Sequence, residues 1–291
     1  MENSISGKTR VAGIIGHSVA HTFSPAMHNA AFAALGLDWV YVPFDTPPEQ
    51  LAAAVAGIKA LGLVGVNVTV PHKEKIIPLL DELTPEAELI GAVNTVLNRE
   101  GRLIGDNTDS RGFLHALLVQ TGFEPAGKTV LILGAGGAAR AIAVGLALGG
   151  AKEIVITNRT RAGGEALRAL LESRFDVGVQ VIAWPDSGSR FPLPGTDLTV
   201  QTTPVGMYPK ATEATPLPLA PWYPGQIVCD LIYNPQETWF LSCARNAGAT
   251  VQNGLGMLLY QGALSFSLWT GLPAPVTVME QVLSEQVKSE G

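Results

Sequence analysis

The sequence predicts an α/β protein of two domains, built largely on parallel sheets. Three observations favour this class. The length of 291 residues is typical of about two domains. Apolar segments of strand length alternate with segments of helical length along most of the chain. Near the middle, the apolar residues 130–133 run directly into glycines, as a buried parallel strand does before a tight turn.

The composition excludes several classes of protein. With 47% hydrophobic and 15% charged residues, the chain is not disordered. A net charge of −6 and the lack of a basic run argue against a nucleic-acid partner. Cys229 and Cys243 have no CxxC spacing, the histidines have no metal-ligand spacing, and no apolar run approaches the roughly 18 residues of a membrane span. We therefore expect a cytoplasmic protein, monomeric or homodimeric, without a metal site.

The first elements expected are a strand over 10–15 and a helix over 26–35. Ser24 and Pro25 form a helix start, because serine suits the N-cap and proline the first helical position. Thr22 and Ser24 therefore present two hydroxyls beside a helix N-terminus, where a small carboxylate would bind. The alternative, favoured by spacing alone, is that Ser24 only caps its helix.

A strand over 39–44, a helix over 49–61 and a strand over 64–70 follow. In the last strand, Asn67 and Thr69 share a face because side chains alternate. Pro71 ends the strand, and a helix is predicted to begin at residue 72 and to continue to about residue 80. Lys73 near its N-terminus is either a proton donor and acceptor or a solvated surface lysine.

Thr84 is predicted to cap a short helix that begins at Pro85. The segment 91–97 leads into a strand that should pair with 102–105 as a hairpin. A helix over 110–118 follows Asp109, which is either a functional carboxylate or the N-cap of that helix.

The glycine segment after residue 133 fits the G-x-G-x-x-G/A dinucleotide fingerprint through Gly134, Gly136 and Ala139. A strand precedes it and a helix over 138–148 follows it, which is the required context. Backbone N–H groups at the helix start would hold the pyrophosphate. The alternative is an ordinary tight turn. The residues expected at the cofactor are Gly134, Ala135, Gly136, Gly137 and Ala138.

The next strand, over 153–157, ends at Asn158, Arg159 and Thr160. NAD-specific folds place an acidic residue near this point to bind the ribose. Here Arg159 can instead pair with a 2′-phosphate and stack on adenine, so the sequence predicts NADP. The alternative is that Arg159 and Arg161 are surface arginines leading into a helix.

Further strands are expected over 179–183, 197–201 and 226–231, all in the same sheet. The segment 191–225 is rich in Pro, Thr and Gly and is read as loops inside one domain. A strongly apolar helix extends to Trp269, and Gln261 within it needs a hydrogen-bond partner. A final helix is expected over 276–287.

The segments around Thr22 and Ser24, 67–73, 91–95 and 106–109 resemble those of shikimate dehydrogenases in residues, order and spacing. The resemblance covers nearly the whole chain. It implies a two-domain enzyme with its active site in a cleft between the domains. It also implies interconversion of 3-dehydroshikimate and shikimate with NADPH or NADP⁺.

The resemblance assigns roles to individual residues. Lys73 and Asp109 correspond to the catalytic pair. The substrate would be bound by Thr22, Ser24, Asn67, Thr69, Asn94, Tyr233 and Gln261. Beyond the fingerprint, the cofactor would be contacted by Asn158, Arg159, Thr160, Thr202, Thr203 and Gly254. A backbone carbonyl remains the alternative partner of Gln261, and half-buried packing the alternative role of Tyr233.

This chain departs from the family pattern at three positions. Thr22 replaces the first serine of a Ser-x-Ser carboxylate clamp, which leaves the preference between shikimate and quinate open. Gln201 replaces an asparagine in the turn before Thr202, and Gly163 replaces a second arginine, for which Arg161 is a substitute.

The expected domains are a substrate-binding domain, 1–110 with 254–291, and a Rossmann-type NADP-binding domain, 111–253. The rival functions are a quinate/shikimate dehydrogenase of broader range and a non-catalytic dinucleotide-binding sensor.

Overall fold

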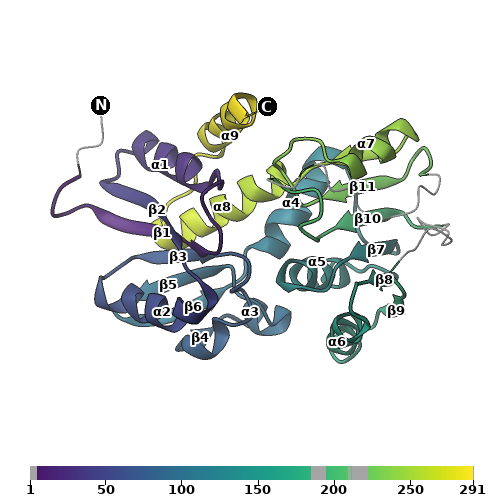
Figure 1. Ribbon diagram of the computed structural model, residues 1–291, viewed down its shortest axis with the longest axis horizontal. Helices are drawn as coiled ribbons and strands as arrows, with labels where there is room; N and C mark the ends of the chain where they lie inside the picture. The colour runs from purple at the N-terminus through teal and green to yellow at the C-terminus, as the bar shows by residue number, and fades with distance from the viewer. Residues whose placement is uncertain (1–4, 185–194, 209–210, 212–221, 291) are drawn as a thin grey trace. The chain divides into compact units, whose positions relative to one another are not determined.

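The computed structural model describes residues 5–184, 195–208, 211 and 222–290. By its internal contacts the chain divides into two compact units. Unit 1 contains the residues up to 112 together with 258–290, and unit 2 contains 113–257. Each unit is built on its own six-stranded sheet (Figure 1).

The sheet of unit 1 is mixed, with the strand order β2-β1-β3-β5-β6-β4. The central β1 pairs in parallel with β2 and β3, whereas β5 pairs antiparallel with β3 and with β6, as the predicted hairpin requires. The strands are β1 (Arg10–Gly16), β2 (Trp39–Asp45), β3 (Gly65–Val68), β4 (Glu82–Leu83), β5 (Thr95–Arg99) and β6 (Arg102–Asp106).

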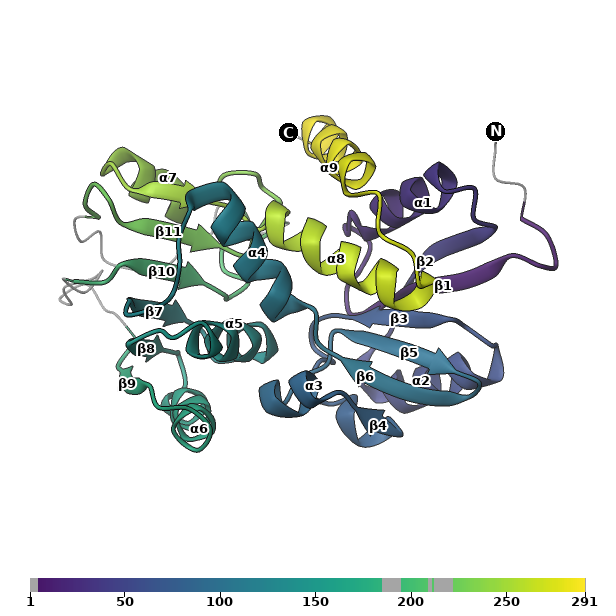
Figure 2. The same ribbon diagram turned by 180° about the vertical axis from the view of Figure 1, so that it is seen from behind.

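Helices cover both faces of this sheet. On one face, Val55 and Ile58 of α2 pack with Val66 and Val96 in a buried cluster. On the other face α8 lies along the sheet, since Trp269 donates to the carbonyl of Val96, and α1 packs beside α8 (Figure 2). The helices of unit 1 are α1 (Ser24–Ala34), η1 (Pro48–Gln50), α2 (Leu51–Ala60), η2 (Ile77–Leu79), α3 (Pro85–Ile90), α8 (Leu255–Thr270) and α9 (Val276–Glu290). The helix α4 (Asp109–Thr121) begins in unit 1 and belongs to unit 2 from residue 113.

Two predicted secondary-structure elements of unit 1 differ in the structure. The segment 72–80 forms turns and the short 3₁₀ helix η2 rather than an α-helix. Pro78 lacks the N–H that a continuing helix needs and disfavours the α conformation at the preceding residue. The strand predicted over 64–70 ends at Val68, so Thr69 and the exposed Val70 lie beyond it.

Unit 2 contains a fully parallel sheet with the order β12-β11-β10-β7-β8-β9. Its strands are β7 (Thr129–Leu133), β8 (Glu153–Thr157), β9 (Gly178–Ile182), β10 (Leu198–Gln201), β11 (Ile227–Asp230) and β12 (Thr250–Gln252). Its helices are α5 (Gly137–Leu148), α6 (Arg161–Glu172) and α7 (Trp239–Asn246). Of the segment predicted as loops, 191–225, the parts 191–194, 209–210 and 212–221 lie outside the described residues.

The strands of unit 2 end in register. Leu133 of β7 lies opposite Thr157 of β8 and Gln201 of β10, and Gln201 lies opposite Asp230 of β11. The turns that follow these strands therefore emerge at one edge of the sheet, where open α/β sheets bind ligands. The predicted fold class, an α/β protein with a Rossmann-type unit, is confirmed by this arrangement.

Candidate active site

Unit 1 holds a largely buried ion pair between Lys73 and Asp109. The Lys73 Nζ atom lies 2.6 Å from Asp109 Oδ2, and the two side chains are 14% and 5% exposed. Lys73 follows the end of β3, and Asp109 follows β6. Lys73 is therefore not a solvated surface lysine. Asp109 bonds to Lys73 and Asn94 rather than capping α4.

Asn94 connects this pair to the strands behind it. Its Nδ2 donates to Asp109 Oδ1 at 2.8 Å, and its Oδ1 accepts from the backbone N–H of Thr108 at 2.7 Å. Since Asn94 is 2% exposed, the contact fixes the plane of the carboxylate. One carboxylate oxygen thus faces the asparagine and the other faces the lysine.

Asn67 lies deeper, 4% exposed, and its amide is occupied on both sides. Its Oδ1 accepts from the Tyr41 hydroxyl at 2.8 Å, while its Nδ2 donates to Ser265 Oγ at 2.9 Å. These bonds hold the Asn67 side chain in one orientation. Thr69 is half-buried beyond the end of β3.

The side chain of Gln261 on α8 points to the same group of residues, around Asn94. Its Nε2 donates to the carbonyl of Leu258 at 2.8 Å, so the backbone alternative is correct for one amide hydrogen. Its Oε1 lies 3.3 Å from Asn94 Nδ2. Gly112 allows its own backbone to pack closely against that of Gln261, because a Cβ there would lie 2.6 Å from the backbone nitrogen of Gln261.

Thr22 and Ser24 place two hydroxyls together at the start of α1. The Thr22 and Ser24 hydroxyl oxygens are 3.2 Å apart, and the Ser24 backbone N–H donates to Thr22 Oγ1 at 3.3 Å. The prediction that Ser24 caps the helix is wrong, because the N-cap is Phe23 and no side-chain cap bond forms. Spacing locates a helix start but not the rotamer of its serine.

The glycine turn in unit 2 meets the requirements of a dinucleotide fingerprint. Gly134 has a φ of +114°, and a Cβ on it would clash with the Thr202 hydroxyl. Gly136 is exposed at the N-cap of α5, and nothing lies within 4 Å of the Cβ that it lacks. Ala139 is buried against the sheet. The turn therefore leaves open space directly over bare backbone, which fits a pyrophosphate.

The second cofactor segment follows β8 at the same edge. Asn158 Nδ2 donates to the Thr160 carbonyl at 2.9 Å and contacts its hydroxyl at 3.0 Å, which closes a tight turn. Arg159 at the apex is exposed. Arg161 instead pairs with Glu165 at 3.2 Å on α6. Arg159 and Arg161 are thus both on the surface, and of the two Arg161 has an acidic partner.

A third turn follows β10 and is held by Gln201, which is fully buried. Its Oε1 accepts from the N–H of Thr203 at 2.6 Å, and its Nε2 donates to the carbonyls of Thr203 and Val205. Gln201, which stands in place of the family's asparagine, therefore still holds this turn through its side-chain amide. The Thr202 hydroxyl donates to the Leu133 carbonyl at 2.7 Å, which ties this turn to the end of β7.

The fourth turn, after β11, carries Tyr233, which is half-buried. Asp230 holds this turn, since its carboxylate accepts from the N–H of Ile232 at 3.0 Å and from the Thr238 hydroxyl at 2.7 Å. Burial raises the pKa of Asp230 to about 7, against the opposing effect of these two bonds. Gly254 packs on the same turn, because a Cβ there would overlap the Leu231 carbonyl.

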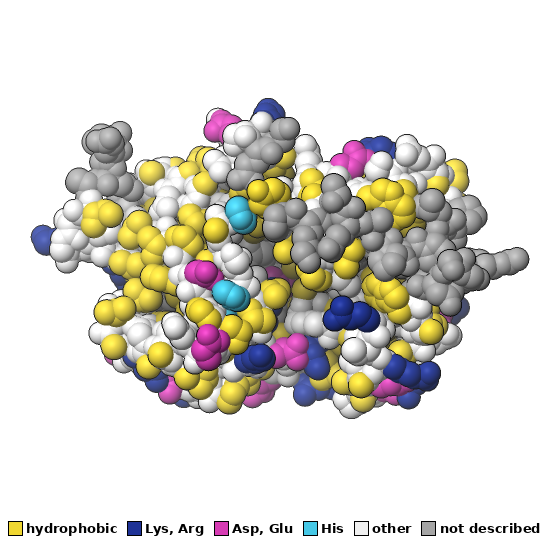
Figure 3. All heavy atoms as spheres, viewed as in Figure 1, with side chains coloured by type: hydrophobic (Ala, Val, Ile, Leu, Met, Phe, Trp, Pro, Cys, Tyr) yellow, Lys and Arg dark blue, Asp and Glu magenta, His cyan; other side chains and the backbone are white. Residues whose placement is uncertain are grey.

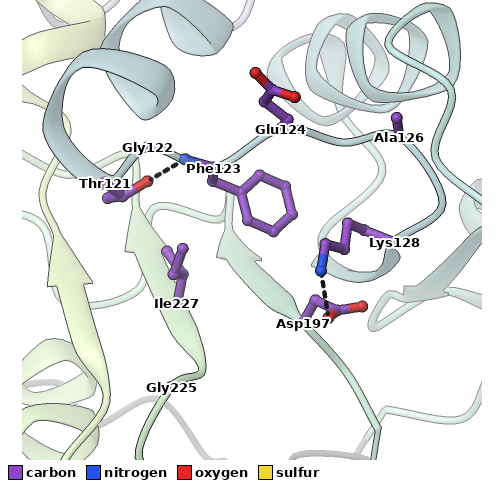
Figure 4. Close-up of a pocket in the computed structure, with 9 residues that line it drawn as sticks. All are labelled: Thr121, Gly122, Phe123, Glu124, Ala126, Lys128, Asp197, Gly225 and Ile227. Carbon is purple, nitrogen blue, oxygen red and sulfur yellow. Dashed lines mark hydrogen bonds and ion pairs between the residues drawn. The ribbon is translucent and has the colours of Figure 1, made fainter.

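A different hollow of unit 2 lies at the opposite edge of the sheet (Figure 4). It has a volume of about 390 Å³ and is lined by Phe123, Ile227 and the ion pair of Lys128 with Asp197, 3.4 Å apart. These residues precede or begin strands. Since ligands of such sheets bind at the carboxyl ends of strands, this hollow is separate from the expected cofactor site.

The surface gives two further observations. On the face seen in Figure 3, basic side chains are interspersed with acidic and hydrophobic ones. Among the residues that the structure describes, no helix has the length and apolar character needed to cross a membrane.

Several residues of unit 1 that matter here were missed by the sequence analysis, namely Tyr41, Thr95, Thr108 and Ser265. Each donates or accepts a hydrogen bond within the group around Asn67 and Asn94. One available signal was the spacing of Ser265, four residues after Gln261 on an otherwise apolar helix. The Ser265 hydroxyl oxygen lies 3.0 Å from the Gln261 carbonyl oxygen, within hydrogen-bond distance.

Comparison with known protein families agrees with this geometry. Residues 14–96 match the shikimate dehydrogenase substrate binding domain. Residues 118–179 match the shikimate / quinate 5-dehydrogenase domain. Residues 254–283 match the shikimate 5'-dehydrogenase C-terminal domain.

Individual relatives extend over almost the entire chain. A shikimate dehydrogenase (NADP⁺) of Desulforamulus reducens is 51% identical over 97% of both chains. A crystal structure of a shikimate dehydrogenase in complex with NADP⁺ superposes with a TM-score of 0.88, at 43% identity and 98% coverage of both chains. A Listeria monocytogenes shikimate 5-dehydrogenase with shikimate and NAD gives a TM-score of 0.86 at 40% identity, covering 96% of this chain and 98% of that one. The resemblance inferred from the motifs is confirmed, and the chain belongs to the shikimate dehydrogenase family.

Proposed function

We propose that this protein is an NADP-dependent shikimate dehydrogenase, which reversibly reduces 3-dehydroshikimate to shikimate in the biosynthesis of aromatic amino acids. The observation that carries the proposal is the largely buried ion pair of Lys73 and Asp109, held by Asn94. The names of relatives about half identical over nearly the full length support the same reaction and cofactor.

Lys73 supplies the proton in this proposal. When bound, NADPH provides a hydride to the carbonyl carbon of the substrate. The Lys73 ammonium then gives a proton to the carbonyl oxygen, which becomes the hydroxyl, and its neutral amine later regains a proton from water. In the oxidative direction the neutral amine accepts the hydroxyl proton. Asp109 stays an acceptor throughout and holds the amine in position.

The remaining polar groups of unit 1 orient the ring acid. Thr22 and Ser24 hold the substrate carboxylate through their adjacent hydroxyls, which lie beside the N-terminus of α1. Thr69, Asn94 and Gln261 form hydrogen bonds with the ring hydroxyls. Asn67, which the resemblance assigns to the same ring hydroxyls, is also bonded to Tyr41 and Ser265 through its amide.

The turns of unit 2 hold the cofactor in this proposal. The glycine turn, Gly134 to Ala138, receives the pyrophosphate, and Gly136 gives it access to bare backbone. Asn158, Arg159 and Thr160 receive the adenosine end, with Arg159 on the 2′-phosphate. Thr202, Thr203, Tyr233 and Gly254 serve the nicotinamide end.

The proposal includes a domain assignment: residues 1–110 with 254–291 bind the substrate, and 111–253 bind NADP. It also includes a cytoplasmic location and a monomeric or homodimeric state. Two free cysteines, one of them buried, suit a reducing compartment. Size-exclusion chromatography with light scattering would decide the oligomeric state.

The deciding experiment is to follow NADPH absorbance with 3-dehydroshikimate. We expect turnover that needs both compounds, and a lower kcat/KM with NADH. The rival quinate/shikimate dehydrogenase predicts that quinate with NAD⁺ is used as well as shikimate with NADP⁺. A cofactor-binding sensor predicts NADPH binding without turnover of either acid.

A further inference from the structure

A continuous series of hydrogen bonds links the interior of unit 1 to the catalytic pair proposed above. It begins at Tyr41 on β2, whose hydroxyl donates to Asn67 Oδ1 at 2.8 Å. Asn67 Nδ2 then donates to Ser265 Oγ on α8 at 2.9 Å. These three side chains are 1%, 4% and 0% exposed, so water does not compete for their bonds.

The series continues from α8 to the carboxylate. Ser265 Oγ lies 2.8 Å from Thr95 Oγ1 on β5. Thr95 donates to Asn94 Oδ1 at 2.9 Å, and Asn94 Nδ2 donates to Asp109 Oδ1 at 2.8 Å. The other carboxylate oxygen, Oδ2, accepts from Lys73.

The direction of the bonds at both asparagines is set by partners with one possible role. Asn67 Nδ2 also faces the carbonyl oxygen of Asn94 at 3.2 Å, which can only accept. Asn94 Oδ1 also faces the backbone N–H of Thr108 at 2.7 Å, which can only donate. Both amides therefore accept on the Tyr41 side and donate on the Asp109 side.

The hydroxyl of Thr95 completes the alignment. Because Asn94 Oδ1 can only accept, the hydrogen of the Thr95 hydroxyl is directed to it, at 2.9 Å. The single hydrogen of the Ser265 hydroxyl has two acceptors within reach, Thr95 Oγ1 at 2.8 Å and the Gln261 carbonyl at 3.0 Å. The shorter contact and the negative charge of Asp109 both favour donation to Thr95, because aligned bonds polarise one another.

At the far end of the series, the neighbouring His28 is neutral. The ring of His28 stacks on Tyr41 with centroids 4.4 Å apart, and burial lowers the pKa of His28 to about 3. At Asp109, Lys73 is the charged partner in contact. Arg111 on the same helix pairs instead with Glu86 and Asp106, at 2.8 and 3.0 Å.

We propose that Thr95 and Ser265 are positioning residues, which relay an aligned series of hydrogen bonds from Tyr41 to Asp109 and keep that carboxylate an oriented acceptor for Lys73. The proposal rests on the proposed function, since it assigns Lys73 and Asp109 to catalysis. Neither residue touches the substrate in this account. Their loss should therefore lower kcat and leave KM almost unchanged.

The test compares Thr95→Val, Thr95→Ser and Ser265→Ala by steady-state kinetics with 3-dehydroshikimate and NADPH. Valine keeps the shape of threonine and removes the hydroxyl, whereas serine keeps the hydroxyl and removes a methyl group. We expect kcat to fall about tenfold in Thr95→Val and Ser265→Ala, the effect of one charge-linked hydrogen bond, with KM within about twofold. Thr95→Ser should restore most of the wild-type kcat.

Ser265→Ala keeps the test decisive if Thr95→Val folds poorly, because alanine is the best helix former. The matched control is Ser267→Ala on the same helix, which lies outside the series and should leave kcat unchanged. An unchanged kcat in Ser265→Ala, or equal losses in Thr95→Ser and Thr95→Val, would overturn the proposal. An inactive wild-type protein would instead refute the proposed function, so the two failures are distinguishable.

Discussion

His28 should make the protein sensitive to acid, and replacing it with phenylalanine should remove that sensitivity. The ring is fully buried, and neither ring nitrogen has a hydrogen-bond partner in the described structure. Burial lowers its pKa from 6.5 to about 3. The folded protein therefore keeps His28 neutral at pH values where the unfolded chain binds a proton.

The size of the effect follows from proton linkage. Between pH 6.5 and about 3 the unfolded state binds one more proton at this residue, so the free energy of unfolding falls as the pH falls. From pH 8 to pH 5 the loss is about 2 kcal/mol, because 1.5 pH units below the unfolded pKa are worth about 1.4 kcal/mol each. Phenylalanine cannot titrate and keeps a flat ring against Tyr41.

The assay is urea denaturation of wild-type protein and His28→Phe at both pH values. Other titrating groups are common to the two proteins, so the difference between them isolates His28. We expect the free energy of unfolding to fall by about 2 kcal/mol less in His28→Phe than in the wild type when the pH is lowered from 8 to 5. An identical pH response of both proteins would show that His28 is not held neutral in the folded state.

Three other predictions concern unit 2. Because the pKa of Asp230 is raised to about 7, the folded state keeps a proton that the unfolded state loses above pH 4. The free energy of unfolding of the wild type should therefore fall from pH 4 to pH 7. Asp230→Asn should lack this fall of up to about 4 kcal/mol in urea titrations. Gly136→Ala should keep the wild-type melting temperature and weaken NADP⁺ binding at least about tenfold in calorimetry. Gly134→Ala should instead lower the free energy of unfolding by about 1–3 kcal/mol, because Gly134 has a φ of +114°. Equal melting temperatures of the two variants would contradict this contrast. Arg159→Gln should weaken NADP⁺ binding about tenfold or more and leave NAD⁺ binding nearly unchanged, and equal losses for both would count against a 2′-phosphate contact.

The predictable part of the fold lies in its periodic segments. The apolar run before Gly134 and the alternation of strands with helices identified the parallel sheet of unit 2, since buried strands leave a composition signal. The hairpin of β5 and β6 and the cap at Thr84 also follow the sequence, because each depends on neighbouring residues only.

What could not be predicted depends on contacts between distant segments. The helix expected over 72–80 is absent because Pro78 interrupts it, although Lys73 still reaches Asp109 from the resulting turn. Ser265 lies 170 residues after Thr95, and no local pattern indicates that their hydroxyls meet. The role of Gln201 likewise became apparent only from its bonds to the turn that it precedes.

The central claim is that Lys73 is the proton donor of a dehydrogenase that uses 3-dehydroshikimate and NADPH. Its most direct test is the rate of NADPH consumption by wild-type protein and by Lys73→Met, with folding checked by circular dichroism. We predict a fall in kcat of about 10²–10⁴-fold with NADPH binding retained, which is the range for loss of a general acid. A folded Lys73→Met protein with a kcat close to that of wild type would contradict the claim.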